Sequence, residues 1–142
     1  MTQSGAIILR YSVCGDDFLH AGEASVDVKG RLKLMGIPAE AIRRAVIALY
    51  EAEINLVIHA HGGEIEVGVT PDAVRMRVED SGPGIEDVSL AMKEGFSTAT
   101  DEIRDLGFGA GMGLPNMKKH ADEFSIESAP GVGTKISMAV RF

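Results

Sequence analysis

The chain has 142 residues, of which 45% are hydrophobic and 25% charged, a balance typical of a globular domain rather than a disordered segment. Its net charge of −7 argues against nucleic-acid binding, and no apolar run is long enough to span a membrane. The single cysteine, Cys14, excludes a disulfide framework and a cysteine-based zinc site. We therefore expect one domain over 1–142, with no signal peptide, in the reducing cytoplasm.

The first half of the chain predicts one strand followed by two helices. Residues 6–13, AIILRYSV, are predicted to form a strand, and residues 17–35 are predicted to form a helix that ends at Gly36. Pro38 suits the first turn of a second helix, which should run to about residue 61 before two glycines stop it. Spacing along this helix predicts a buried apolar stripe made of Ile42, Leu49 and Leu56.

The second half predicts two hairpins, separated by a glycine-bearing region and a short helix. Residues 64–69 and 73–79 alternate between apolar and polar side chains, and a tight turn joins them. A helix is expected over 114–122, and a final hairpin turns at 130–133. Because each strand has one apolar face, the prediction is an α+β fold, a two-layer sandwich in which helices cover one face of a mixed, mostly antiparallel sheet.

A polar face on the second predicted helix is the first candidate for chemistry. Glu51, Asn55 and His59 lie one turn apart and away from the apolar stripe, among otherwise apolar neighbours. Burying a carboxylate and an amide in such surroundings costs free energy unless they are hydrogen-bonded or paired. They could equally be a solvated face, with Glu51 and Asn55 paired for local stability. For His59 a structural role is the better interpretation, since a lone histidine is seldom catalytic.

Three glycine motifs follow, and each by itself could be an ordinary turn or flexible loop. Asp80 follows a strand and leads into Gly82-Pro83-Gly84, a rigid turn with close backbone access. Residues 107–113 hold four glycines before a helix, where bare amides suit phosphate oxygens. A turn at 131–134 ends in Thr134. The run at 107–113 fits neither the dinucleotide fingerprint nor the P-loop, so those nucleotide sites are disfavoured.

In order, the four motifs are Glu51-x-x-x-Asn55, Asp80-x-Gly82-x-Gly84, Gly109-x-Gly111-x-Gly113 and Gly131-x-Gly133-Thr134. Their order and spacing resemble the N box and three glycine boxes of the GHKL ATPase superfamily, whose members share the Bergerat ATP-binding fold. Glu51 stands where sensor histidine kinases usually carry Asn, and this looks like the anti-sigma-factor serine kinases of the SpoIIAB and RsbW type. The stretches 80–87, 94–98 and 122–125 look closer still to RsbT-type switch kinases.

The resemblance implies a single histidine kinase-like ATPase domain that binds ATP or ADP with Mg²⁺. Asp80 would accept from the adenine amino group with support from Thr134, Asn55 would ligate Mg²⁺, and Glu51 would be the general base. Segment 94–113 would be a lid that orders over the phosphates. The remaining residues implied for the nucleotide site are Gly82, Gly84, Ser97, Thr98, Gly109, Gly111, Met112, Gly113 and Leu114.

The implied function is an ATP-dependent serine/threonine protein kinase that phosphorylates a STAS-domain partner in a partner-switching pathway, such as a stress response. The alternative is an anti-sigma factor that sequesters a sigma factor under nucleotide control, and segment 99–108, longer than in RsbT-type chains, keeps it open. Glu51 disfavours a detached histidine-kinase domain, and the chain length disfavours a gyrase or chaperone ATPase. A downstream phosphatase partner and a homodimer are left open.

Overall fold

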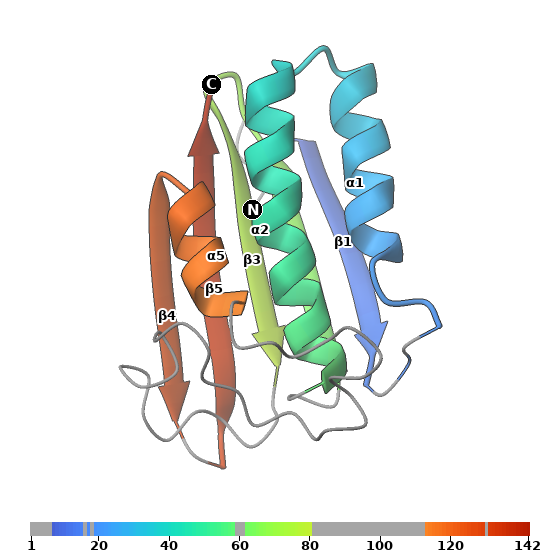
Figure 1. Cartoon of the computed structure of the whole chain (residues 1–142), viewed down its shortest axis with the longest axis vertical. Helices are drawn as coiled ribbons and strands as arrows, with labels where there is room; N and C mark the ends of the chain where they lie inside the picture. Colours follow the sequence, from blue (N-terminus) through green and yellow to red (C-terminus); the bar gives the residue numbers. More distant parts are fainter. Residues whose placement is uncertain (1–6, 16, 18, 59–61, 81–112, 130) are drawn as a thin grey trace.

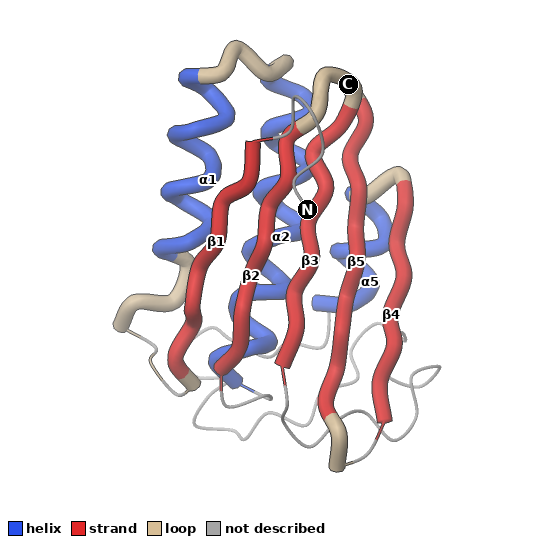
Figure 2. Tube along the Cα trace, turned by 180° about the vertical axis from the view of Figure 1, so that it is seen from behind, coloured by secondary structure: helices blue, strands red, loops and turns tan. Residues whose placement is uncertain are grey.

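The computed structural model describes residues 7–15, 17, 19–58, 62–80, 113–129 and 131–142. Within these residues it forms two layers, a sheet and a layer of helices that covers one face of it (Figures 1 and 2). The predicted α+β two-layer sandwich is therefore confirmed.

The sheet has five strands, which are β1 (Ile7–Cys14), β2 (Gly62–Val69), β3 (Ala73–Asp80), β4 (Glu123–Ala129) and β5 (Gly133–Arg141). Their order across the sheet is β1-β2-β3-β5-β4, and every pairing between them is antiparallel. No parallel pair occurs among these strands, so the sheet is more regular than the mixed one expected. Strands β3 and β5 are neighbours although a long stretch of chain separates them, and this pairing joins the two predicted hairpins.

Three described helices pack on the sheet, α1 (Glu23–Leu34), α2 (Ala39–Ile58) and α5 (Gly113–His120). The predicted stripe on α2 is buried, since Ile42, Leu49 and Leu56 are at most 5% exposed. It packs on the inward side chains of the central strands, which include Val67, Val74, Met76, Ile136, Met138 and Val140. None of the helices described is both long and apolar enough to cross a membrane.

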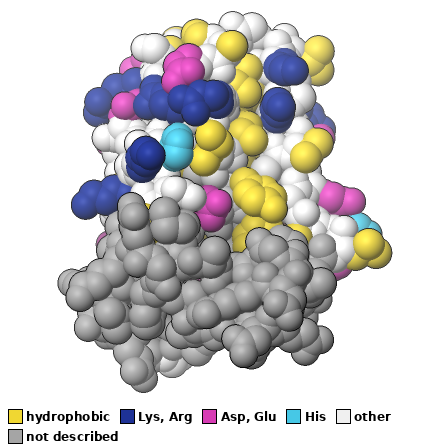
Figure 3. Space-filling model, viewed as in Figure 1, with side chains coloured by type: hydrophobic (Ala, Val, Ile, Leu, Met, Phe, Trp, Pro, Cys, Tyr) yellow, Lys and Arg dark blue, Asp and Glu magenta, His cyan; other side chains and the backbone are white. Residues whose placement is uncertain are grey.

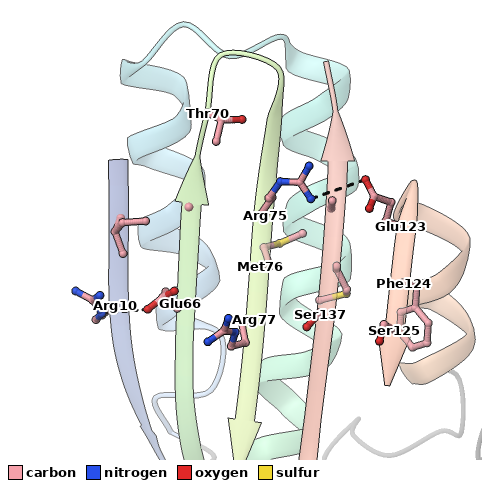
Figure 4. Close-up of a pocket in the computed structure, with 14 residues that line it drawn as sticks. Arg10, Glu66, Thr70, Arg75, Met76, Arg77, Glu123, Phe124, Ser125 and Ser137 are labelled. Carbon is pink, nitrogen blue, oxygen red and sulfur yellow. Dashed lines mark hydrogen bonds and ion pairs between the residues drawn. The ribbon is translucent and has the colours of Figure 1, made fainter. Parts of the chain in front are cut away.

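The opposite face of the sheet is polar, and no described helix covers it (Figure 2). Arg10 on β1 and Glu66 on β2 are cross-strand partners whose side chains form an ion pair of 3.2 Å between Nε and Oε2. Arg75 on β3 reaches Glu123 on β4 across the intervening strand, at 3.8 Å (Figure 4). The alternation along the strands, interrupted in β5 where Met138, Ala139 and Val140 are all buried, thus separates a dry helical side from a wet side, as the sequence pattern predicted.

The first helix begins later than predicted. Helix α1 starts at Glu23, whereas the sequence pattern suggested residue 17, and the preceding Gly22 adopts a left-handed backbone with φ 96°. No side chain within α1 caps this end. Its capping group comes instead from α2, so the start of α1 depends on a tertiary contact that local sequence does not reveal.

That capping group is the carboxylate of Glu53, which is only 2% exposed. Its two oxygens accept the backbone N–H groups of Gly22, Ala24 and Ser25 at 2.9, 3.2 and 2.9 Å, and the Ser25 hydroxyl at 2.7 Å. A carboxylate is well suited to the free amides and positive dipole at a helix N-terminus. Glu53 therefore joins α1 to α2 and has no capacity left for chemistry.

On its other side α1 is tied to the sheet. The Tyr11 hydroxyl on β1 donates to Asp27 at 2.6 Å, and Arg31, one turn on, donates to the same carboxylate at 2.8 Å. Burial and the hydrogen bond to Asp27 raise the pKa of Tyr11 to about 12, so the phenol stays neutral over the physiological range. Helix α1 is thus held by polar groups on both of its neighbours.

We predict that Glu53→Ala lowers the free energy of unfolding by about 2–4 kcal/mol, because it leaves buried helix-end amides without acceptors. Urea titration followed by circular dichroism measures the change. Glu40→Ala is the matched control: Glu40 lies on the same helix but is exposed and bonded to Arg43. The control should change stability by no more than about 0.5 kcal/mol. Equal effects of the two substitutions would contradict the capping role.

Candidate functional site

Polar groups from α2 and α5 converge at the start of α5. Helix α5 begins at Gly113, which faces Glu51 and Asn55 of α2. A side-chain Cβ built on Gly113 would lie 3.4 Å from Asn55 Oδ1 and 3.4 Å from Glu51 Oε2. The missing side chain therefore leaves a space the size of a methyl group, bordered by a carboxylate, an amide oxygen and the first turn of a helix. Two of the three residues predicted to share a face of α2 meet at this space.

Glu51 is half-buried in this position. Burial raises the pKa of its carboxyl, while a hydrogen bond from the Asn116 side chain and the nearby His120 act in the opposite direction. Both of these residues belong to α5. The buried Leu114 and Met117 of the same helix pack in the core, which holds α5 against α2. The carboxylate thus lies in a partly dehydrated setting formed by two helices.

A second group of polar residues lies at one end of the sheet. Asp80, at the end of β3, is the cross-strand partner of Thr134 at the start of β5. The Thr134 hydroxyl is 2.8 Å from that of Ser128 on β4, its partner on the other side. The ends of β3 and α2 and the start of β5 lie together at the lower end of the molecule in Figure 1. Two predicted site residues, far apart in sequence, are therefore neighbours.

Sequence reasoning missed Ser128 and Gly63. Ser128 could have been found from the hairpin register, which places it opposite Thr134. Gly63 was interpreted only as part of a helix stop. A Cβ on Gly63 would come within 2.4 Å of the Glu79 carbonyl oxygen, 2.9 Å of Leu56 and 3.1 Å of the Asp80 Cβ. Only glycine fits there, so the backbone of β2 packs directly against the end of β3 beside Asp80.

Several predicted site residues lie outside the described residues, as do His59 and all of the predicted lid except Gly113. They are Gly82, Gly84, Ser97, Thr98, Gly109, Gly111 and Met112. The described part of the site therefore consists of the α2–α5 space around Glu51, Asn55 and Gly113, and the strand-end group around Asp80 and Thr134.

Comparison with known proteins shows the family to which the chain belongs. Residues 40–142 match the family model of the histidine kinase-, DNA gyrase B- and HSP90-like ATPases. The chain belongs to this ATPase family. The matched residues include every described group of the site, from Glu51 on α2 to Thr134 on β5.

The names of individual relatives are more specific than the name of the family. The chain is 36% identical over 97 residues to the serine/threonine-protein kinase RsbT of Bacillus subtilis (strain 168), an alignment that covers 66% of this chain and 67% of that protein. It is 36% identical over 104 residues to an anti-sigma F factor of Caldanaerobacter subterraneus subsp. tengcongensis, covering 70% and 69%. The match to the solved structure of the mycobacterial sensor histidine kinase MprB covers 95% of this chain and 97% of the MprB chain, at 15% sequence identity and a TM-score of 0.49.

We predict that Gly113→Ala separates stability from nucleotide binding. The new methyl group would occupy the space between Asn55 and Glu51 at ordinary contact distance, so the fold should tolerate it and gain up to about 1 kcal/mol from the better helix former. ATP affinity, measured by calorimetry, should fall about tenfold or more, equivalent to at least about 1.4 kcal/mol.

The matched control is Gly30→Ala in the middle of α1, where a Cβ meets no atom within 4 Å. It should stabilise the protein by a similar amount and leave ATP affinity unchanged. If Gly113→Ala binds ATP as tightly as the control does, the space in front of Gly113 is not part of the nucleotide site.

Proposed function

We propose that this protein is an ATP-dependent serine/threonine protein kinase whose substrate is a STAS-domain partner in a partner-switching pathway. The observation that carries the proposal is the convergence of Glu51, Asn55 and Gly113, which places a half-buried carboxylate beside an amide oxygen and a helix N-terminus. Relatives named as a serine/threonine kinase and as anti-sigma F factors support it. We further propose that 1–142 is one domain and acts in the cytoplasm.

The adenine end of ATP is assigned to the strand-end group. A carboxylate of Asp80 can accept from an amino group, and Thr134 beside it can share a bridging water. In the proposed site Gly82 and Gly84 lack side chains, so the backbone can approach the adenine ring closely.

The phosphate end is assigned to the α2–α5 space. Asn55 supplies an oxygen ligand of the kind that Mg²⁺ prefers, and the missing side chain of Gly113 leaves room in front of it. Bound Mg²⁺ would neutralise phosphate charge. The backbone N–H groups of Gly113 and Leu114 begin α5, whose dipole favours anions. Gly109, Gly111 and Met112, with Ser97 and Thr98, complete the proposed phosphate-binding set.

Glu51 is assigned as the general base. As the substrate hydroxyl oxygen forms its bond to the γ-phosphorus and the bond to the ADP oxygen breaks, the Glu51 carboxylate takes the hydroxyl proton. Burial raises the pKa of this carboxyl, which makes it a stronger base as long as it is ionised near neutral pH. Phosphoryl transfer otherwise needs little beyond positioning and charge neutralisation.

A protein substrate has to reach Glu51, and the helical face offers a route. A groove between α1 and α2 has Glu51 among its lining residues, together with the apolar side chains of Val26, Val46, Ile47 and Tyr50. Val26 is 71% exposed and Tyr50 38% exposed. Figure 3 shows this apolar area on the helical face, with acidic and histidine side chains beside it. Exposed apolar surface next to the proposed base favours a protein partner over a small-molecule acceptor.

The nucleotide site is tested by calorimetry with ATP in the presence and absence of Mg²⁺. We predict that Asp80→Asn weakens binding about tenfold or more under both conditions, because an amide cannot replace the carboxylate acceptor without a donor facing the amino group. Asn55→Ala should remove most of the Mg²⁺ dependence. Asp72→Asn, an exposed aspartate just before the same strand, is the control and should have no effect. Normal ATP affinity in both site variants would refute the nucleotide site.

The kinase assignment is tested with labelled ATP and a STAS-domain protein. We predict that Glu51→Gln leaves ATP affinity nearly unchanged, because glutamine keeps the size and can still hydrogen-bond. The amide cannot take a proton, so the rate of serine or threonine phosphorylation should fall by about 10²–10⁴-fold. Glu40→Gln, an exposed glutamate at the start of the same helix, should phosphorylate at the wild-type rate. A wild-type rate in Glu51→Gln would exclude Glu51 as the base.

A further inference from the structure

A guanidinium from α2 holds the end of α5 that lies away from the candidate site. Arg44 donates to the His120 carbonyl at 3.4 Å and to the Arg141 carbonyl at 3.2 Å. It also donates to Asp122 Oδ1 at 3.1 Å. These acceptors belong to the last residue of α5, the residue before β4 and the last residue of β5. One side chain of α2 thus joins the end of α5 to two strands of the sheet.

The Asp122 carboxylate is itself fixed by β5. Its Oδ2 accepts the Arg141 N–H at 2.7 Å, and the Asp122 N–H donates to the Ala139 carbonyl at 2.8 Å. The hydrogen bonds from the Arg141 N–H and from Arg44 lower the pKa of Asp122, so this carboxyl is ionised at neutral pH. Arg44 therefore binds acceptors whose positions the sheet determines.

The two helices run antiparallel, so Arg44 and the candidate site lie at opposite ends of one helix–helix contact. Arg44 meets the last residue of α5, whereas Glu51 and Asn55 border Gly113, its first residue. The contacts of Arg44 and of Glu51 are about two helical turns apart on both α2 and α5. Because these spacings match, the contact at one end determines which groups of α2 face the start of α5.

We propose that Arg44 is a positioning residue that sets how far α5 lies along α2, and so places the start of α5 in front of Asn55. The inference rests on the proposed nucleotide site and adds a residue that touches neither ATP nor the reacting atoms. The buried Leu114 and Met117 also hold α5 on the core. Apolar packing is non-directional, so it resists separation of two helices more than a small slide between them. The directional hydrogen bonds of Arg44 prevent that slide.

The residue type suits this task. A planar guanidinium presents its N–H donors in a fixed fork, so several acceptors can be held in one geometry. Nη1 of Arg44 reaches His120 and Asp122, and Nη2 reaches Arg141. A lysine ammonium would keep the charge opposite Asp122 but could not hold all three acceptors at these positions.

The test compares the binding of ATP with that of adenosine, which lacks the phosphates. We expect Arg44→Met to weaken ATP binding about tenfold or more in calorimetry, while the Kd for adenosine stays within about twofold, because the proposed adenine end lies on the strands. Arg44→Lys should lie between this variant and the wild type, and it carries the test if Arg44→Met does not fold. Arg43→Met is the control and should change neither Kd, because Arg43 is exposed and bonded to Glu40 on its own helix.

A second measurement needs no nucleotide. In proton–nitrogen NMR spectra, the signals of the Gly113 backbone amide and the Asn55 side-chain amide should shift in both Arg44 variants but not in Arg43→Met, because a slide of α5 changes their surroundings. Unshifted signals, an unchanged ATP affinity, or an equal loss of affinity for ATP and adenosine would each overturn the inference. If the wild type binds no ATP while these signals shift, the proposed nucleotide site fails and the positioning by Arg44 stands.

Discussion

The packing of α2 on the central strands is the constraint on which the rest of the structure depends. One side of this helix is buried on the sheet through Leu49 and Leu56, so its rotation about its own axis is fixed. The other side chains are then distributed among its neighbours by helix geometry alone. Glu53 faces α1, Glu51 and Asn55 face the start of α5, and Arg44 faces the end of α5. The packing of α2 on the sheet thus positions both Glu53, which caps α1, and the candidate site.

Glu51 and Glu53 show how environment separates two identical side chains. They are two residues apart, which turns them about 200° away from each other on the helix. Glu53 is buried and accepts from three backbone N–H groups and one hydroxyl, so it stabilises the fold. Glu51 is only half-buried and borders the space left by Gly113. The saturated carboxylate is structural, whereas the less satisfied one is the carboxylate that we propose as the general base.

The local sequence pattern predicted the helices and strands well but misplaced the start of helix α1. The strands were predicted within about two residues because alternation and the turn residues depend only on near neighbours. The start of α1 was placed six residues too early because the acceptor that defines it, Glu53, lies on another helix. Ser128 and Gly63 were missed for the same reason. Each matters through a cross-strand or inter-helix contact that no spacing rule along the chain contains.

By itself the sequence determined the fold class, the family and which residue types could carry chemistry, because periodicity and motif spacing are written along the chain. Tertiary structure alone decided which of them meet. Asp80 lies beside Thr134 because β5 inserts between β3 and β4, and Asn55 and Glu51 meet Gly113 because α5 packs on α2. These contacts join residues more than fifty positions apart. Their cause is the burial of apolar faces, which fixes how the elements dock and leaves the polar groups at the ends to meet.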